Sequence, residues 1–221
     1  MKVSQHFVIV TAIFITCLLT ANIVGVKFAS FGPFNLPAAV VLFPLSYIVG
    51  DILTEVYGYR LARRVIWLGF MGNLIFVIIA WVGRVLPSAP LWEAQEAYET
   101  ILGYTPRLLV ASFFGYLAGE FANSFVLAKM KILTRGRQLW SRTISSTIVG
   151  QGLDSAIFIT GAYFGAPFFA PIVILHHWLA KTAIEAVATP LTYAVVNYLK
   201  KKEAMDTYDD ETNFNPFSIS D

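Results

Sequence analysis

The sequence predicts an all-α integral membrane protein with six transmembrane helices and both termini in the cytoplasm. Hydrophobic residues make up 57% of the chain and charged residues 14%, with a mean hydropathy of +0.64. Soluble domains contain about 45–50% apolar and about 25% charged residues. Six stretches approach the roughly 20 apolar residues that a spanning helix needs. These features argue against a soluble enzyme, a nucleic-acid-binding domain and a disordered scaffold.

The expected helices follow from uninterrupted apolar runs and from the positions of proline. Residues 7–26 carry no charge and form the first helix. Pro33 and Pro37 interrupt the next uncharged run, so we expect a loop there and a second helix that starts near Pro37. Pro190 falls inside the last helix, where its missing N–H should produce a kink. In chain order, the six expected helices cover residues 7–26, 37–57, 65–86, 107–127, 143–163 and 169–198.

The basic residues are distributed unevenly between the two sides of such a chain. Twelve of the 16 Lys and Arg residues fall on the side of the two termini, three on the other side, and Lys181 inside the last helix. Basic loops stay in the cytoplasm, so both termini are expected there. Arg63 and Arg64 are interpreted as topology anchors rather than ligands. The chain then divides into a transport domain, residues 1–200, and a loose, polar and acidic cytoplasmic tail, residues 201–221.

Polar residues inside the expected helices are the candidate binding residues. A charged side chain near the bilayer centre costs about 2.5–3.5 kcal/mol on insertion scales, so it is retained facing a partner or a cavity. Several of these residues recur at spacings of three or four, which places them on one helix face. The candidates for substrate binding are Asn22, Tyr47, Asp51, Glu120, Asn123, Gln151, Asp154, Lys181 and Glu185.

Structural interpretations stay open beside the functional one. Glu55 is compatible with simple neutralisation of Arg63 or Arg64. Gly115 and Gly119 are more typical of a helix-packing surface than of a substrate contact. Lys181 is expected to pair with either Asp154 or Asp51, because a pair neutralises two costly charges.

The balance of intramembrane charge indicates the kind of ligand. Carboxylates outnumber the single intramembrane lysine, so the site should favour a ligand that is rich in N–H donors or positively charged. No P-loop, H-E-x-x-H or G-x-S-x-G motif occurs, and Cys17 is the only cysteine. We therefore expect no enzyme activity, no ATPase motif, no cofactor and no metal. The expected partners are a small molecule and membrane lipids, with no nucleic acid; a homo-oligomer is compatible with the sequence.

Two segments resemble a known family. The segment F-P-L-S-Y-I-V-G-D-I-L-T-E-V-Y-G-Y-R-L-A-R-R-V-I-W, residues 43–67, resembles the signature of the queuosine precursor transporter family (YhhQ type), and so does G-Q-G-L-D-S-A-I-F, residues 150–158. The resemblance extends over residues 5–200. The residues that match the family motifs by position are Asp51, Arg63, Arg64, Asp154 and Lys181, with Asn22 matching less specifically.

This resemblance implies a fold similar to the six-helix substrate-binding components of energy-coupling-factor transporters. It also implies import of 7-cyano-7-deazaguanine, 7-aminomethyl-7-deazaguanine, or both, across the bacterial inner membrane for queuosine synthesis in tRNA. The alternative function is a substrate-binding component of a vitamin or nucleobase uptake system energised by a separate ATPase module. The preferred precursor, proton coupling against facilitated diffusion, and the oligomeric state stay open.

The implied ligand agrees with the charge balance. A deazaguanine ring offers N–H and NH2 donors that a carboxylate accepts in bidentate fashion. Our hypothesis is that Asp154 or Glu120 binds this edge. Gln151 and Asn123 would serve the carbonyl and the ring nitrogen, and Lys181 would hold the empty site together.

Overall fold

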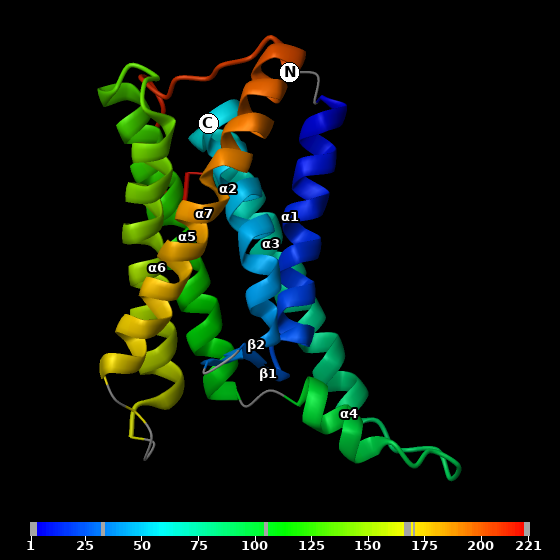
Figure 1. Ribbon diagram of the computed structural model, residues 1–221. Helices are drawn as coiled ribbons and strands as arrows, with labels where there is room; N and C mark the ends of the chain where they lie inside the picture. The colour runs from blue at the N-terminus through cyan, green and yellow to red at the C-terminus, as the bar shows by residue number, and fades with distance from the viewer. Residues whose placement is uncertain (1–3, 32–33, 104–105, 166–168, 170, 219–221) are drawn as a thin grey trace.

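The computed structural model describes residues 4–31, 34–103, 106–165, 169 and 171–218. Within these residues the chain is mainly helical, and its long helices lie side by side and alternate in direction (Figure 1). The start of the first helix and the end of the last lie at the same end of the bundle, where His6 Nδ1 and Glu203 Oε1 are 2.6 Å apart. The helices are α1 (Gln5–Val24), α2 (Phe43–Tyr57), α3 (Tyr59–Val85), α4 (Gln95–Leu102), α5 (Pro106–Leu133), α6 (Leu139–Tyr163) and α7 (Pro171–Glu203).

The connection between α1 and α2 differs from the expected loop. Strands β1 (Phe28–Phe31) and β2 (Phe34–Pro37) form an antiparallel pair, and a 3-10 helix, η1 (Ala38–Leu42), leads into α2. The all-α fold class holds, and the short strand pair is a local exception within the segment expected to be a loop. Backbone N–H and C=O groups near the membrane must find partners within the protein, and the strand pair provides them.

Among the described residues, three helices are long and apolar enough to cross a membrane: Gln5–Val24, Tyr59–Val85 and the Leu109–Leu133 part of α5. On α3, an outward stripe of large apolar side chains is at least 40% exposed, as expected of a surface that faces lipid. It consists of Leu68, Met71, Ile75, Ile79 and Val82. The described chain is thus a membrane protein with three candidate spanning helices.

Helices α2, α6 and α7 do not meet this criterion of length and hydropathy, for two reasons. Helix α2 has only 15 residues, although η1 precedes it. Helices α6 and α7 are long, but they carry several of the polar residues singled out above, which lower their mean hydropathy. The six-span prediction stays a prediction. Helix α7 includes Pro190 without a break and ends at Glu203, just beyond the expected domain boundary.

Helices α5 and α6 pack through small residues. A Cβ atom added to Gly119 would lie 2.8 Å from Cβ of Asp154, and one added to Gly150 would lie 2.7 Å from Cβ of Asn123. Real Cβ contacts are not this short, so these glycines allow the two backbones to approach. The interpretation of Gly115 and Gly119 as a packing surface is confirmed, because Gly115 also faces Asp154.

The C-terminal residues 204–218, here called the tail, pack against the bundle instead of hanging loose. The carboxylate of Asp209 is buried and accepts a hydrogen bond from the backbone N–H of Tyr59, with oxygen distances of 3.0 and 3.2 Å. Gly58, with φ of +84°, makes the turn between α2 and α3, and a Cβ there would meet Thr207 at 2.6 Å. The expectation of a loose tail was wrong because the tail supplies partners to this turn.

Candidate functional site

Eight of the nine predicted binding residues belong to the four helices α2, α5, α6 and α7, and the side chains of seven of these eight are described. We call these seven residues the central polar cluster. Five of them are no more than 8% exposed, which is unusual for polar side chains unless they face partners. The cluster consists of Asp51 from α2, Glu120 and Asn123 from α5, Gln151 and Asp154 from α6, and Lys181 and Glu185 from α7.

One ion pair joins α6 to α7. Lys181 Nζ lies 2.5 Å from Asp154 Oδ2, so of the two partners that the sequence left open, Asp154 is the one found. Glu120 interacts electrostatically with both groups. Gly115 on α5 makes room for this pair, since a Cβ atom there would lie 3.0 Å from Asp154 Oδ1.

The other half of the cluster contains a pair of carboxyl groups. Asp51 is 1% exposed and Glu185 is 0% exposed, and their side chains lie close enough to interact directly. Asn123 Nδ2 donates to Asp51 Oδ1 at 3.3 Å. Among the residues that the structure describes, no donor reaches Asp51 Oδ2 or either carboxyl oxygen of Glu185. The buried Asn123 Oδ1 beside them also lacks a partner there.

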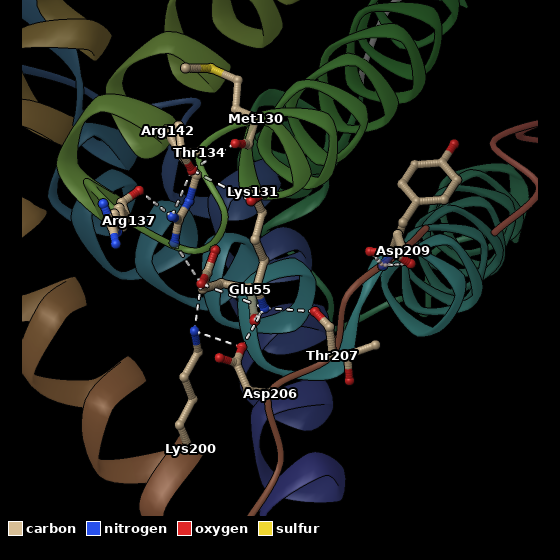
Figure 2. Close-up of polar contacts among 11 residues, drawn as sticks. Glu55, Met130, Lys131, Thr134, Arg137, Arg142, Lys200, Asp206, Thr207 and Asp209 are labelled. Carbon is tan, nitrogen blue, oxygen red and sulfur yellow. Dashed lines mark hydrogen bonds and ion pairs between the residues drawn. The ribbon is translucent and has the colours of Figure 1, made fainter. Parts of the chain in front are cut away.

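A second charged region, the tail-end ion network, lies where α2 ends (Figure 2). Glu55 Oε1 is 2.7 Å from Arg142, 2.6 Å from Lys200 and 3.6 Å from Lys131. Asp206 of the tail bridges Lys131 at 2.6 Å and Lys200 at 2.8 Å. Three cations and two carboxylates from α2, α5, α6, α7 and the tail are therefore paired in one network.

This network shows which residues pair with Glu55 and explains the lowered pKa of Asp206. Glu55 does serve neutralisation, but its partners are not Arg63 or Arg64. Partial burial alone would raise the pKa of the Asp206 carboxyl, but hydrogen bonds from Lys131 and Lys200 and their positive charges outweigh it and lower the pKa below its ordinary value.

The remaining predicted residues lie elsewhere. Asn22 donates to Asn73 Oδ1 and so links α1 to α3, as expected for polar residues between membrane helices. Tyr47 belongs to α2, but its side chain lies outside the described residues. Arg63 is buried and donates through NH1 to the carbonyls of Asn213 and Asn215, both at 2.7 Å, whereas Arg64 is exposed.

Two features escaped the sequence-based reasoning. His177 is not among the predicted binding residues, but its Nδ1 lies 3.0 Å from the hydroxyl of Ser155, beside the central polar cluster. The i, i+4 spacing of His177 and Lys181 was the available signal. A cleft of about 680 Å³ opens between the tail and the start of α3, and none of its lining residues belongs to the cluster.

Comparison with known proteins identifies the family of this chain. Residues 37–195, more than two thirds of the chain, match the family described as "Putative vitamin uptake transporter". The chain belongs to this family. Its members are transporters, which agrees with the apolar helices and with charged residues retained among them.

Three curated relatives of this chain have more specific names. A Bacillus subtilis protein named "Probable queuosine precursor transporter" is 29% identical over 74% of this chain and 72% of its own length. The Escherichia coli "Queuosine precursor transporter" is 23% identical over 79% of this chain and 71% of its own. A Haemophilus influenzae protein, also named "Probable queuosine precursor transporter", is 23% identical over 72% of this chain and 64% of its own length. These relatives confirm the family resemblance seen in the sequence. No solved structure matches.

Proposed function

We propose that this protein imports queuosine precursors, 7-cyano-7-deazaguanine and 7-aminomethyl-7-deazaguanine, across the bacterial inner membrane for queuosine synthesis in tRNA. The observation that carries this proposal is the similarity, over most of the chain, to relatives named queuosine precursor transporters. The central polar cluster supports it independently, because its surplus of carboxyl and carboxamide oxygens suits a ligand rich in N–H donors.

Glu120 is the carboxylate best suited to bind the guanine-like edge. Asp154 is engaged with Lys181, whereas no hydrogen bond or ion pair of Glu120 occurs among the described residues. Glu120 Oε2 lies 3.7 Å from the position of a Cβ on Gly50, so this carboxyl group faces α2 across a glycine. A carboxylate that accepts two N–H bonds from a flat ring would discriminate guanine-like rings from rings that lack this pair of donors.

The neighbouring residues then have distinct tasks. Asn123 and Gln151 present carboxamides that can donate to the ring carbonyl and accept from ring N–H groups. The Asp154–Lys181 pair keeps α6 and α7 together when no ligand is bound. Because the cluster is nearly closed to solvent, α2 or α7 must move to admit a ligand.

In this proposal both termini and the tail-end ion network are cytoplasmic. The basic residues of the network and of the adjoining loops gather at that end, as the positive-inside rule requires. Arg63 and Arg64 belong to the same end.

The test is complementation of a bacterium that can neither make nor import these precursors. Expression of this chain with each precursor supplied at nanomolar concentration should restore queuosine in tRNA with at least one of them. No restoration, with the protein detected in the membrane, would contradict the proposal.

The family description supports a second candidate, a substrate-binding component of a vitamin or nucleobase uptake system energised by a separate ATPase. Co-purification of a stoichiometric ATPase, and uptake that stops when its genes are deleted, would favour this candidate. Uptake in a host that lacks such an ATPase would exclude it.

A further inference from the structure

The Asp51–Glu185 pair has hydrogen-bonding needs that ionised groups cannot meet. Two ionised carboxylates are acceptors only, so neither can donate to the other. In that state Asp51 Oδ2 and both Glu185 oxygens lack a donor within the described part of the chain, although both residues are almost fully buried. One proton between them converts the contact into a carboxyl–carboxylate hydrogen bond, which is short and strong.

The surroundings make the doubly ionised form still less favourable. The groups that face Asp51 are Glu120 and Asn123 from α5, Glu55 from its own helix and Glu185 from α7, and three of these are acidic. Lys181, one turn from Glu185, is bound to Asp154. The cations of the tail-end ion network are bound to Glu55 and Asp206. Two uncompensated charges in a protein interior would cost several kcal/mol each.

We propose that Asp51 and Glu185 share one bound proton and that its uptake and release couple import to proton entry, an inference that rests on the proposed function. The site is distinct from the Glu120–Asp154–Lys181 group that would hold the substrate. The bond bridges α2 and α7, the helices that flank the closed cluster. Loss of the proton leaves two facing negative charges that repel and separate these helices, and rebinding closes them.

In the resulting transport cycle, one proton enters with each substrate molecule. With α2 and α7 open to the outside, the pair takes one proton from that side and closes around bound substrate. When the helices open to the inside, the pair releases the proton there and the substrate leaves. The inward proton gradient can thereby drive substrate to a higher concentration inside than outside.

The bound proton can be tested without any substrate. In purified protein, infrared spectroscopy at neutral pH should show the C=O stretch of a protonated carboxylic acid, and this band should disappear at alkaline pH. Glu185→Gln and Asp51→Asn should each lose it, because the carboxamide donates to the remaining carboxylate and replaces the proton. Glu99→Gln, on the exposed face of α4 beside Arg84, is the matched control and should retain it. No difference between wild type and the two variants would overturn the proton site.

The coupling is tested in proteoliposomes with uncharged 7-cyano-7-deazaguanine as the probe and the membrane potential held at zero. A tenfold inward proton gradient should give about tenfold accumulation of the probe, since one proton per substrate transfers the whole gradient. In Glu185→Gln we expect no accumulation, whereas the control Glu99→Gln should accumulate the probe as wild type does. Accumulation in the variant equal to wild type, or wild-type transport without proton movement, would overturn the coupling.

The two assays separate the possible failures. If the infrared band behaves as expected and no precursor is transported, the proposed substrate is wrong and the proton site stands. If precursors are transported and the band is absent or unaffected by the variants, the proposed function stands and the proton site is wrong.

Discussion

The tail-end ion network and the central polar cluster are both groups of charges between helices, but they differ in how their carboxyl groups are paired. In the network, every carboxylate contacts at least two cations: Glu55 contacts three and Asp206 two. In the cluster, four carboxyl groups accompany a single amine, Lys181, which pairs with one of them. A network in which every carboxylate has cationic partners needs no ligand to be stable.

The cluster keeps hydrogen-bonding capacity that its own residues do not use, and among the described residues neither oxygen of the Glu185 carboxyl has a partner. In the network, Glu55 Oε2 and Arg142 Nε also lack a partner, but each of these side chains is held by an ion pair through its other atoms. Unpaired buried polar groups cost free energy, so a protein retains them where a ligand or a proton completes them. This difference supports our proposal that the network maintains structure and that the cluster takes part in transport. The predictions below test this difference, and they begin with the largest expected effect.

Glu55→Gln should destabilise the folded protein by about 3–5 kcal/mol, because Arg142, Lys131 and Lys200 would lose the anion that they share. The measurement is thermal unfolding in detergent together with membrane yield. Asp51→Asn, only one turn away, should leave the folded protein intact. Equal stability of the two variants would remove the distinction between network and cluster.

Lys181→Ala or Asp154→Ala should abolish uptake while the protein still inserts into the membrane. Removal of one partner of a buried pair costs about 2–5 kcal/mol, which corresponds to a loss of affinity of roughly 30-fold or more. The double variant Asp154→Asn with Lys181→Met removes both charges and sharpens the test. If it regains uptake, the pair serves only to hold the helices; if it stays inactive, the charges themselves are needed.

Glu120→Gln should raise the KM for uptake about 10- to 100-fold without changing stability. The substitution removes an ionised acceptor, and hydrogen bonds to charged groups contribute about 1.5–3 kcal/mol. Initial uptake rates over a range of precursor concentrations give the KM. Asp210→Asn, on the exposed part of the tail, is the matched control. An unchanged KM would exclude Glu120 from the binding site.

Gly119→Ala should destabilise the protein by about 1–3 kcal/mol, because its methyl group would overlap with Asp154 and push α5 away from α6. Gly72→Ala is the control, since a Cβ there would lie 3.6 Å from Ile15 Cγ2, an ordinary contact. The measurement is the unfolding temperature of each variant, which should fall for Gly119→Ala and stay near wild type for Gly72→Ala. If both behave alike, close approach of α5 and α6 is not what keeps the cluster together.

Acid should loosen the tail slightly. Because the folded pKa of Asp206 lies below its ordinary value, its ion pairs stabilise the tail above that value, 3.8, and this contribution is lost as the pH falls below it. The side chain is 44% exposed, so the effect should stay under about 1 kcal/mol. Hydrogen exchange of residues 204–218, corrected for the intrinsic effect of pH, measures it. Asp206→Asn should abolish the dependence; an unaltered response would assign it to another group.

Local sequence patterns predicted the helices and most of the cluster. Apolar runs located α1, α3 and α5, and the i, i+4 spacing of Lys181 and Glu185 placed both on the face of α7 that enters the cluster. The small residues of α5 indicated a packing surface, which α6 occupies. These features depend on periodicity alone, so a single sequence contains them.

Long-range pairings were not predictable in the same way. Glu55 was assigned to nearby arginines, but its partners Arg142 and Lys200 are 87 and 145 residues away. The tail seemed loose because its composition is polar, whereas its packing depends on Asp209 reaching the first N–H of α3. Nothing in local composition specifies which distant element provides a missing hydrogen-bond partner.

The position of the tail has a consequence for biosynthesis. The residues that close the tail-end ion network and cap the turn at Gly58 leave the ribosome only after every helix they contact has been made. Glu55, Lys131 and Arg142 are therefore synthesised before Asp206. We therefore expect this end of the bundle to reach its final packing last, when residues 204–218 bind to helices that were made before them.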